Sequence, residues 1–239
     1  MNKIVLVGGS SEIGIAIANE LLSKHPTKFD SLHRLSTTLQ CAGSTSWAPV
    51  DLMSALDGLQ KIEIKNGDLV IVGLGKLTEP KSTATGYIDL EELNTTFMVN
   101  FLVPMFSMTY FYNAMKKRNG GEIIVLSSTA AFPVLRNNFF YGLAKLALDI
   151  NARYLQTLFT ESKVKITIVR SGFVSTKLNE GRKPTPFSRT SEEVANQVVK
   201  NLGKSIIWTP RVFQLISLTL GKVKALQLIA NYLVGKSKS

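Results

Sequence analysis

Short runs of apolar residues alternate along this chain with longer stretches in which apolar residues recur every three or four positions. A short apolar run bounded by glycine or polar residues is typical of a buried strand, and the longer spacing is typical of an amphipathic helix. The predicted strands are residues 3–7, 29–35, 47–50, 69–72, 123–126, 165–169 and 205–208. Strands that alternate with helices predict an α/β fold with a mostly parallel sheet.

The length and composition favour one large domain. The chain has 239 residues, of which 45% are hydrophobic, enough for a substantial core. We assign residues 1–209 to this domain. We expect residues 210–239, which are apolar with interspersed lysines, to form a basic amphipathic tail packed on the domain or on a membrane surface.

The net charge of +11 favours contact with an anionic partner. No Asp or Glu follows Asn196, whereas lysine and arginine recur to the end of the chain. No zinc-finger or RNP sequence is present, so nucleic acid is the partner we expect least. The chain shows no signal peptide and no run of eighteen uncharged apolar residues, which predicts a cytoplasmic or peripheral membrane protein.

A glycine-rich segment follows the first predicted strand and opens a helix that runs to about Lys24. Glycines at this place let the backbone approach a pyrophosphate, and the start of the helix offers free N–H groups to it. We therefore expect a single doubly wound Rossmann domain. The dinucleotide-binding candidates in this segment are Gly8, Ser10, Ser11, Ile13 and Gly14.

Three polar residues that could handle a proton follow the predicted strand at 123–126. Ser128 follows the strand, and Tyr141 and Lys145 are four residues apart, so a helix would place both on one face. A phenol has an ordinary pKa of about 10. We expect the Lys145 ammonium to lower the pKa of Tyr141, so that the phenol exchanges a proton more easily near neutral pH.

These residues resemble the short-chain dehydrogenase/reductase family, whose hallmark is Tyr-x-x-x-Lys with a serine about thirteen residues upstream. The resemblance implies catalytic roles for Ser128, Tyr141 and Lys145, and a water-holding role in a proton relay for Asn100. It also implies that Lys145 holds the nicotinamide ribose. The chain departs from the family pattern at Glu12, where the family has glycine, and at Ser171, where it has proline.

The resemblance also extends the cofactor site. No acid that would bind the 2′-hydroxyl of NAD lies near the end of the second predicted strand, whereas Arg34 is suited to the 2′-phosphate of NADP. We therefore expect NADPH rather than NADH. The further cofactor-binding candidates are Arg34, Asp51, Leu52, Gly73, Gly75, Tyr141, Lys145, Ser171, Gly172, Val174 and Thr176.

Four segments resemble one branch of the family, the decaprenylphosphoryl-2-keto-erythro-pentose reductases: GGSSEIG, LSSTAA…LRNNFFYGLAKLALD, VRSGFVSTKL and IIWTPRVFQLI. This resemblance implies reduction of the 2-keto group of a polyprenylphosphoryl pentose to the arabinose form. It also implies a flavin-dependent oxidase as the first half of an epimerase, and we expect a homo-oligomer. Arg136, Arg182 and Lys183 are our candidates to bind the substrate phosphate.

Two alternatives stay open at this point. The chain is also compatible with a reductase of another keto substrate, such as a 3-oxoacyl thioester. The other alternative is a non-catalytic NADP-sensing regulator, against which the complete set of Asn100, Ser128, Tyr141 and Lys145 argues.

Overall fold

The computed structural model confirms a parallel α/β architecture. It describes the whole chain except residues 37–43, 47–50, 78–88, 133–137 and 216–239. Within the described residues, seven strands form one sheet in the order β3-β2-β1-β4-β5-β6-β7, and every neighbouring pair is parallel. The strands are β1 (Asn2–Val7), β2 (Phe29–Ser36), β3 (Ser44–Ser46), β4 (Leu69–Val72), β5 (Gly121–Ser128), β6 (Val164–Ser171) and β7 (Ile206–Thr209).

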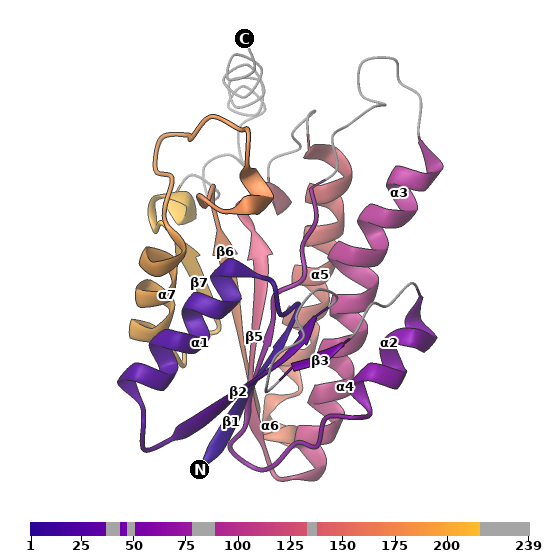
Figure 1. Ribbon diagram of the computed structural model, residues 1–239, viewed down its shortest axis with the longest axis vertical. Helices are drawn as coiled ribbons and strands as arrows, with labels where there is room; N and C mark the ends of the chain where they lie inside the picture. The colour runs from indigo at the N-terminus through magenta and orange to yellow at the C-terminus, as the bar shows by residue number, and fades with distance from the viewer. Residues whose placement is uncertain (37–43, 47–50, 78–88, 133–137, 216–239) are drawn as a thin grey trace.

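Helices cover both faces of this sheet (Figure 1). The first face is covered by α1 and α7, and the second by α2, α4 and α5. The helices are α1 (Glu12–Lys24), α2 (Leu52–Leu59), α3 (Leu90–Phe97), α4 (Val103–Lys117), α5 (Phe139–Thr157), α6 (Phe159–Ser162) and α7 (Ser191–Lys200). Short 3₁₀ turns are η2 (Thr129–Ala131) and η4 (Lys177–Asn179), and η1 (Met98–Leu102) is a π-helical turn.

The apolar periodicity of the chain explains these two layers. Residues of β1 alternate between faces, so that Val5 and Val7 pack toward α2, α4 and α5, while Ile4 and Leu6 pack toward α1 and α7. All four side chains are fully buried. The two resulting cores hold the carboxyl ends of β1, β4 and β5 at one edge of the sheet.

The order of the strands reverses between β1 and β4. From β1 the chain passes outward to β2 and β3, and it then crosses back to β4 on the other side of β1. In open parallel sheets, ligands bind outside the carboxyl ends of the strands at such a reversal. The fold therefore directs a ligand to the glycines that follow β1 and β4.

Two predicted elements differ in detail from the structure. We predicted the third strand at residues 47–50, which lie outside the described residues. The structure describes β3 just before them, at Ser44–Ser46. Apolar residues also recur at helical spacing from Leu90 to Lys117, a pattern typical of a continuous helix. The structure instead has α3 and α4 separated by η1, because a single π-helical turn shifts the helical register at its centre.

The first described residues of the predicted tail belong to the domain. A side chain at Gly172 would collide with the ring of Phe213, and the Phe213 ring lies 6.3 Å from the ring of Phe187 in an edge-on arrangement. Phe213 therefore packs beside the end of β6. The remainder of the tail, from residue 216, lies outside the described residues, so its packing stays a prediction. Among the helices that the structure describes, none is both long and apolar enough to cross a bilayer.

Candidate active site

The glycine-rich segment after β1 forms a close backbone junction with the end of β4. Gly8 adopts a positive φ of 88°, and a Cβ atom there would lie 2.9 Å from the backbone nitrogen of Leu74. At Gly73 the added atom would lie 3.0 Å from the hydroxyl of Ser11. Only glycine fits the first position without strain. A side chain at either position would crowd the junction beside the start of α1, where the family resemblance expects the phosphates of a dinucleotide.

Ser11 closes the start of α1. Its side chain is the helix N-cap and accepts a hydrogen bond from the N–H of Gly14 at 3.2 Å. The preceding Ser10 is exposed and Ile13 is half-buried. A carboxylate at position 12 would repel bound phosphates if it pointed toward them. The Glu12 carboxylate instead accepts the backbone N–H of Lys177 at 3.0 Å. The residues at this helix end fit a bound pyrophosphate.

Tyr141 and Lys145 lie one turn apart on α5, as predicted. The Nζ atom of Lys145 is 5.9 Å from the centre of the Tyr141 ring. Lys145 is buried, and its ammonium donates hydrogen bonds to the carbonyl oxygens of Leu74 at 2.9 Å and Leu126 at 3.1 Å. Leu126 lies within β5 and Leu74 lies two residues after β4, so the backbone at this edge of the sheet holds the ammonium in place.

Burial shifts the pKa values of both Lys145 and Tyr141. Burial lowers the pKa of Lys145 to about 8. Burial also raises the pKa of Tyr141 above its ordinary value, against the opposing effects of a hydrogen bond with Ser128 and of the Arg182 charge. Our expectation that Lys145 lowers the pKa of Tyr141 was therefore wrong for this structure, because desolvation dominates and the cation that acts on the phenol is Arg182. The net result is a phenol that keeps its proton at neutral pH.

Ser128 ends β5 beside the phenol. Its hydroxyl accepts a hydrogen bond from the N–H of Ala130 at 3.1 Å and lies 3.5 Å from the carbonyl oxygen of Ser171. Ser171 is the last residue of β6. It pairs with Ser128 on β5 and with Thr209 on β7, so β6 is paired on both sides to its end. A proline at position 171 would lack the backbone N–H donor. Serine at this position therefore suits a β6 strand that is paired on both sides.

Asn100 lies in the π-helical turn and is fully buried. Its side-chain oxygen accepts the N–H of Lys76 at 3.0 Å, and its amide donates to the carbonyls of Lys76 and Thr96, each at 2.9 Å. A Cβ atom at Gly75 would lie 3.8 Å from both this oxygen and the Lys145 ammonium. The structure thus brings Asn100, Gly75 and Lys145 together.

Several predicted cofactor residues have other visible contacts. Asp51 caps α2, and its hydrogen bonds with Ser54 hold the pKa of its carboxyl below the ordinary value. Leu52 begins α2 and packs on the core. Arg34 lies within β2 opposite Leu6 and Ser44, two residues before the strand ends. Their cofactor contacts stay predictions.

The segment after β6 folds back over the site. Val174 is buried, and Thr176, which precedes η4, is half-buried. Leu178 in η4 lies 3.9 Å from the position of a Cβ atom at Gly75. Further along, the Nη1 atom of Arg182 lies 3.4 Å from the side-chain oxygen of Asn138, the residue that begins α5.

The predicted substrate residues are only partly brought together. Arg182 reaches the catalytic side, Lys183 is exposed, and Arg136 lies outside the described residues. Sequence reasoning missed Asn138 and the carbonyl partners of Lys145. The position of Asn138 directly before a predicted helix could have indicated it. The carbonyl partners of Lys145 could not be predicted, because every residue has a backbone carbonyl.

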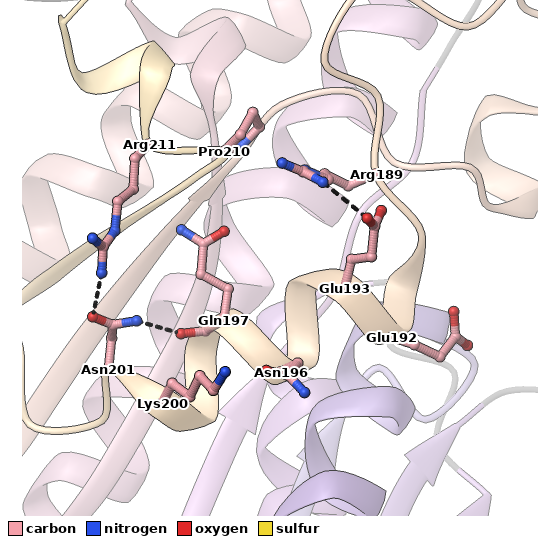
Figure 2. A pocket seen from close by; sticks show the side chains of 9 residues that line it. All are labelled: Arg189, Glu192, Glu193, Asn196, Gln197, Lys200, Asn201, Pro210 and Arg211. Atoms are coloured by element: carbon pink, nitrogen blue, oxygen red, sulfur yellow. Dashed lines mark hydrogen bonds and ion pairs between the residues drawn. The ribbon is translucent and has the colours of Figure 1, made fainter.

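An open cavity of about 680 Å³ lies elsewhere, along α7 and the end of β7 (Figure 2). Arg189 and Glu193 form an ion pair at 2.8 Å on one side of it, and Arg211 donates to Asn201 at 3.1 Å on the other. Its remaining lining residues are Glu192, Asn196, Gln197, Lys200 and Pro210. None of the predicted site residues is among these nine, so this cavity is separate from the catalytic residues.

Comparisons with known proteins agree with this geometry. The family description "short chain dehydrogenase" matches residues 2–186. The chain belongs to the short chain dehydrogenase family. Membership makes it an NAD(P)-dependent oxidoreductase, and the positions of Ser128, Tyr141 and Lys145 agree with that chemistry.

One curated relative is an uncharacterized oxidoreductase of Mycobacterium tuberculosis, 27% identical over 221 residues, covering 87% of this chain and 88% of the relative. A short-chain dehydrogenase of Burkholderia cenocepacia, solved in complex with NADP, has a TM-score of 0.76 at 15% identity, covering 96% of this chain and 97% of the other. An alcohol dehydrogenase of Thermococcus sibiricus, complexed with 5-hydroxy-NADP, has a TM-score of 0.67 at 18% identity, covering 87% and 95%. These two structures share the fold.

Proposed function

We propose that this protein is an NADPH-dependent reductase of a carbonyl group that lies close to an anionic group of its substrate. The observation that carries this proposal is the position of Arg182. Its guanidinium approaches Asn138, three residues before Tyr141, and its charge acts on the Tyr141 phenol. An arginine is well suited to phosphate because its planar group donates two parallel hydrogen bonds.

The proton chemistry follows from the pKa values of the site. Because the pKa of Tyr141 is raised, the phenol is protonated at neutral pH and serves as the general acid that protonates the carbonyl oxygen. Ser128 donates a hydrogen bond to the same oxygen. When bound, the nicotinamide supplies the hydride for the carbonyl carbon.

Lys145 and Asn100 organise the site around the phenol. With a pKa of about 8, Lys145 is mostly charged at pH 7, and two of its three donors are used by the Leu74 and Leu126 carbonyls. The third donor is then directed to a ribose hydroxyl, as the family resemblance implies. Asn100 fixes the backbone of Lys76, next to Gly75, and so supports the wall of the site.

NADPH rather than NADH is the proposed cofactor. Arg34, near the end of β2, is our candidate to bind the 2′-phosphate, and the proposal is supported by two structural neighbours that carry NADP or a derivative of it. Gly8, Ser11, Gly73 and the start of α1 supply the phosphate side of the site.

For the substrate, we propose a polyprenylphosphoryl pentose whose 2-keto group is reduced to the arabinose form for cell-wall arabinan synthesis. The sequence resemblance suggests this compound, and the rim of the site supports an amphiphilic molecule. Leu178 and Phe187 are large, exposed apolar side chains in the same segment as Arg182. Phe187 packs edge-on against Phe213. A flavin-dependent oxidase would supply the keto sugar as the first half of an epimerase.

The membrane contact is part of the same proposal. A polyprenyl chain stays in the bilayer, so the enzyme must reach the headgroup at its surface. The sequence from residue 216 adds Lys222, Lys224, Lys236 and Lys238 with no acidic residue. Each lysine near an anionic surface contributes about 1 kcal/mol of attraction. We expect the full-length protein to sediment with anionic liposomes at low salt, and protein that stays in the supernatant would contradict this part.

The substrate is tested by NADPH oxidation with a polyprenylphosphoryl keto-pentose, a neutral keto sugar and an acetoacetyl thioester. We expect the phosphorylated lipid to react fastest. Arg182→Ala should raise the KM for the phosphorylated substrate by roughly ten- to a hundredfold, the value of a charged hydrogen bond, and leave the neutral sugar unaffected. Arg189→Ala, which removes a guanidinium paired with Glu193 at the separate cavity, is the matched control.

Equal losses on both substrates in Arg182→Ala would eliminate Arg182 as the phosphate-binding residue. If the acetoacetyl thioester reacts fastest, the substrate is an oxoacyl thioester and the assignment of the pentose is wrong. Arg136→Ala is expected to act like Arg182→Ala, although residue 136 lies outside the described residues.

A further inference from the structure

Glu12 makes a contact between the first helix of the domain and the segment that follows β6. It is the first residue of α1, and its Oε1 atom accepts the backbone N–H of Lys177, a residue 165 positions later, at 3.0 Å. Lys177 begins the turn η4, directly after Thr176. Hydrogen bonds to a carboxylate are among the stronger ones because the acceptor is charged.

The turn held by this bond lies over the catalytic residues. Leu178 follows Lys177, and its side chain lies 3.9 Å from the position of a Cβ atom at Gly75, the same position that lies 3.8 Å from the Lys145 ammonium. One end of η4 is therefore tied to the helix that begins the cofactor site, and its next side chain lies against Gly75, which also adjoins Lys145.

The turn is also held by hydrogen bonds on its far side. The Asn179 side chain donates to the carbonyl of Val174 at 2.9 Å, and the N–H of Arg182 donates to the carbonyl of Asn179 at 3.1 Å. Arg182 is thus five residues from the Glu12 contact and is connected to it by short hydrogen bonds. Its guanidinium then reaches Asn138 at the start of α5.

An acidic residue in the first turn of a helix also stabilises the helix through the macrodipole. That effect needs only a negative charge near the N-terminus. It does not require the carboxylate to meet Lys177, and a glutamine would not provide it. The two roles therefore separate in a Glu12→Gln variant, which keeps the accepting oxygen and loses the charge.

We propose that Glu12 is a positioning residue that ties the segment 177–182 to α1 and thereby places Arg182 beside Tyr141. The tie itself is independent of the substrate, and only the consequence for catalysis rests on the proposed role of Arg182. A glycine at position 12, as in the family pattern, would leave this segment without its anchor on α1.

The tie is tested by hydrogen exchange of the full-length protein without ligands, followed by mass spectrometry of the peptide that contains Lys177. In Glu12→Ala we expect the Lys177 amide to exchange about tenfold faster, since its closed state loses its acceptor. In Glu12→Gln we expect exchange within about twofold of the wild-type rate, because the amide oxygen still accepts. Glu63→Ala, at an exposed residue before β4, is the control.

A second readout uses the basic residues of the segment itself. Trypsin cleaves after Lys177 and Arg182, and cleavage there should be faster in Glu12→Ala than in the wild type, Glu12→Gln or Glu63→Ala. Unchanged exchange and unchanged cleavage in a folded Glu12→Ala protein would overturn the tie. Acceleration in Glu12→Gln equal to that in Glu12→Ala would overturn the hydrogen bond as its cause.

The catalytic consequence is measured with the phosphorylated keto substrate. Glu12→Ala should raise its KM by about tenfold, with the NADPH dissociation constant changed by less than about threefold, and Glu12→Gln should restore the KM. A faster-exchanging loop with an unchanged KM would overturn the positioning of Arg182. Hydrogen exchange and trypsin cleavage need no turnover. If the proposed substrate does not react, these two measurements still decide whether Glu12 holds the segment.

Discussion

The Nζ atom of Lys145 lies 5.9 Å from the centre of the Tyr141 ring, one helical turn away on α5. The ammonium is held by the backbone carbonyls of Leu74, just after β4, and Leu126, within β5, rather than by a carboxylate. Uncharged partners do not offset the loss of hydration, so burial lowers the pKa of Lys145 to about 8. The charge of this lysine therefore depends on pH close to neutrality.

A pH profile follows from this value. Above pH about 8, Lys145 loses its proton and its charge, so kcat/KM for NADPH, which reports groups of the free enzyme, should fall as pH rises through that value. Lys145→Arg keeps a positive charge to about pH 12, so in a folded variant the fall should disappear. Lys117→Arg, at an exposed residue of α4 outside the predicted site, should retain the fall. A fall near pH 8 that persists unchanged in Lys145→Arg would assign it to another group.

A buried ion pair behind the site carries the second prediction. Arg170 on β6 donates two hydrogen bonds to Asp149 on α5, at 2.6 and 2.8 Å, and Ser127 donates to the same carboxylate at 3.1 Å. The guanidinium contacts the rings of Phe132 and Trp208, 4.4 and 4.8 Å from their centres, and the two ring centres are themselves 5.2 Å apart. The pair joins α5 to the sheet next to Ser128.

Arg170→Met leaves the Asp149 carboxylate buried without its partner and should lower the free energy of unfolding by about 3–5 kcal/mol. Arg189→Met, which breaks the exposed pair with Glu193, should cost less than about 1 kcal/mol. Urea denaturation measures both. The double variant Arg170→Met/Asp149→Leu should recover part of the loss, and similar costs for the buried and exposed pairs would contradict this account.

Much of the fold and part of the site were predictable from the sequence. Apolar runs such as residues 69–72 predicted the strand with the bounds that β4 has. Ser128, Tyr141 and Lys145 were predictable because their spacing around a strand and a helix brings them together by local geometry. The proximity of Asn100 to these residues depends on the packing of α3, η1 and α4 against α5. Asn100 could still be singled out as a candidate, because it is a polar residue in an otherwise apolar stretch.

Other features had no local signal. The apolar period continues through Met98–Leu102, so nothing in it indicated a π-helical turn there. The direction of the Tyr141 pKa depends on how far the phenol is buried, which is a property of the whole fold. The contact between Glu12 and Lys177 joins residues 165 positions apart through a backbone N–H, and a backbone donor is present at nearly every position.

The predicted homo-oligomer has a candidate surface on α5. Four large apolar side chains of this helix are exposed by about two-fifths or more, and their spacing places them on one stripe. They are Phe139, Leu143, Ile150 and Tyr154. Ile150→Lys/Tyr154→Lys should lower the molar mass measured by light scattering to that of a monomer. Met53→Lys, at an exposed apolar residue of α2, should leave the mass unchanged, and a wild-type monomer would contradict the prediction.

The cofactor prediction depends on Arg34. We expect the wild type to prefer NADPH over NADH, and Arg34→Ala to weaken NADPH binding by about ten- to a hundredfold, since a charged phosphate contact contributes roughly 1.5–3 kcal/mol. NADH binding should change little. Fluorescence titration of both cofactors measures this, with Arg153→Ala, at an exposed residue of α5, as the control. Equal affinity of the wild type for both cofactors would refute the prediction.

The central claim is that Tyr141 donates the proton during carbonyl reduction. Tyr141→Phe removes only the hydroxyl, so NADPH binding measured by fluorescence should be retained while single-turnover NADPH oxidation with the keto substrate falls by about 10²- to 10⁴-fold. Tyr154→Phe, which removes an exposed hydroxyl from the same helix, should keep the wild-type rate. A Tyr141→Phe rate within about tenfold of the wild type, with the cofactor bound, would contradict the assignment of Tyr141 as the general acid.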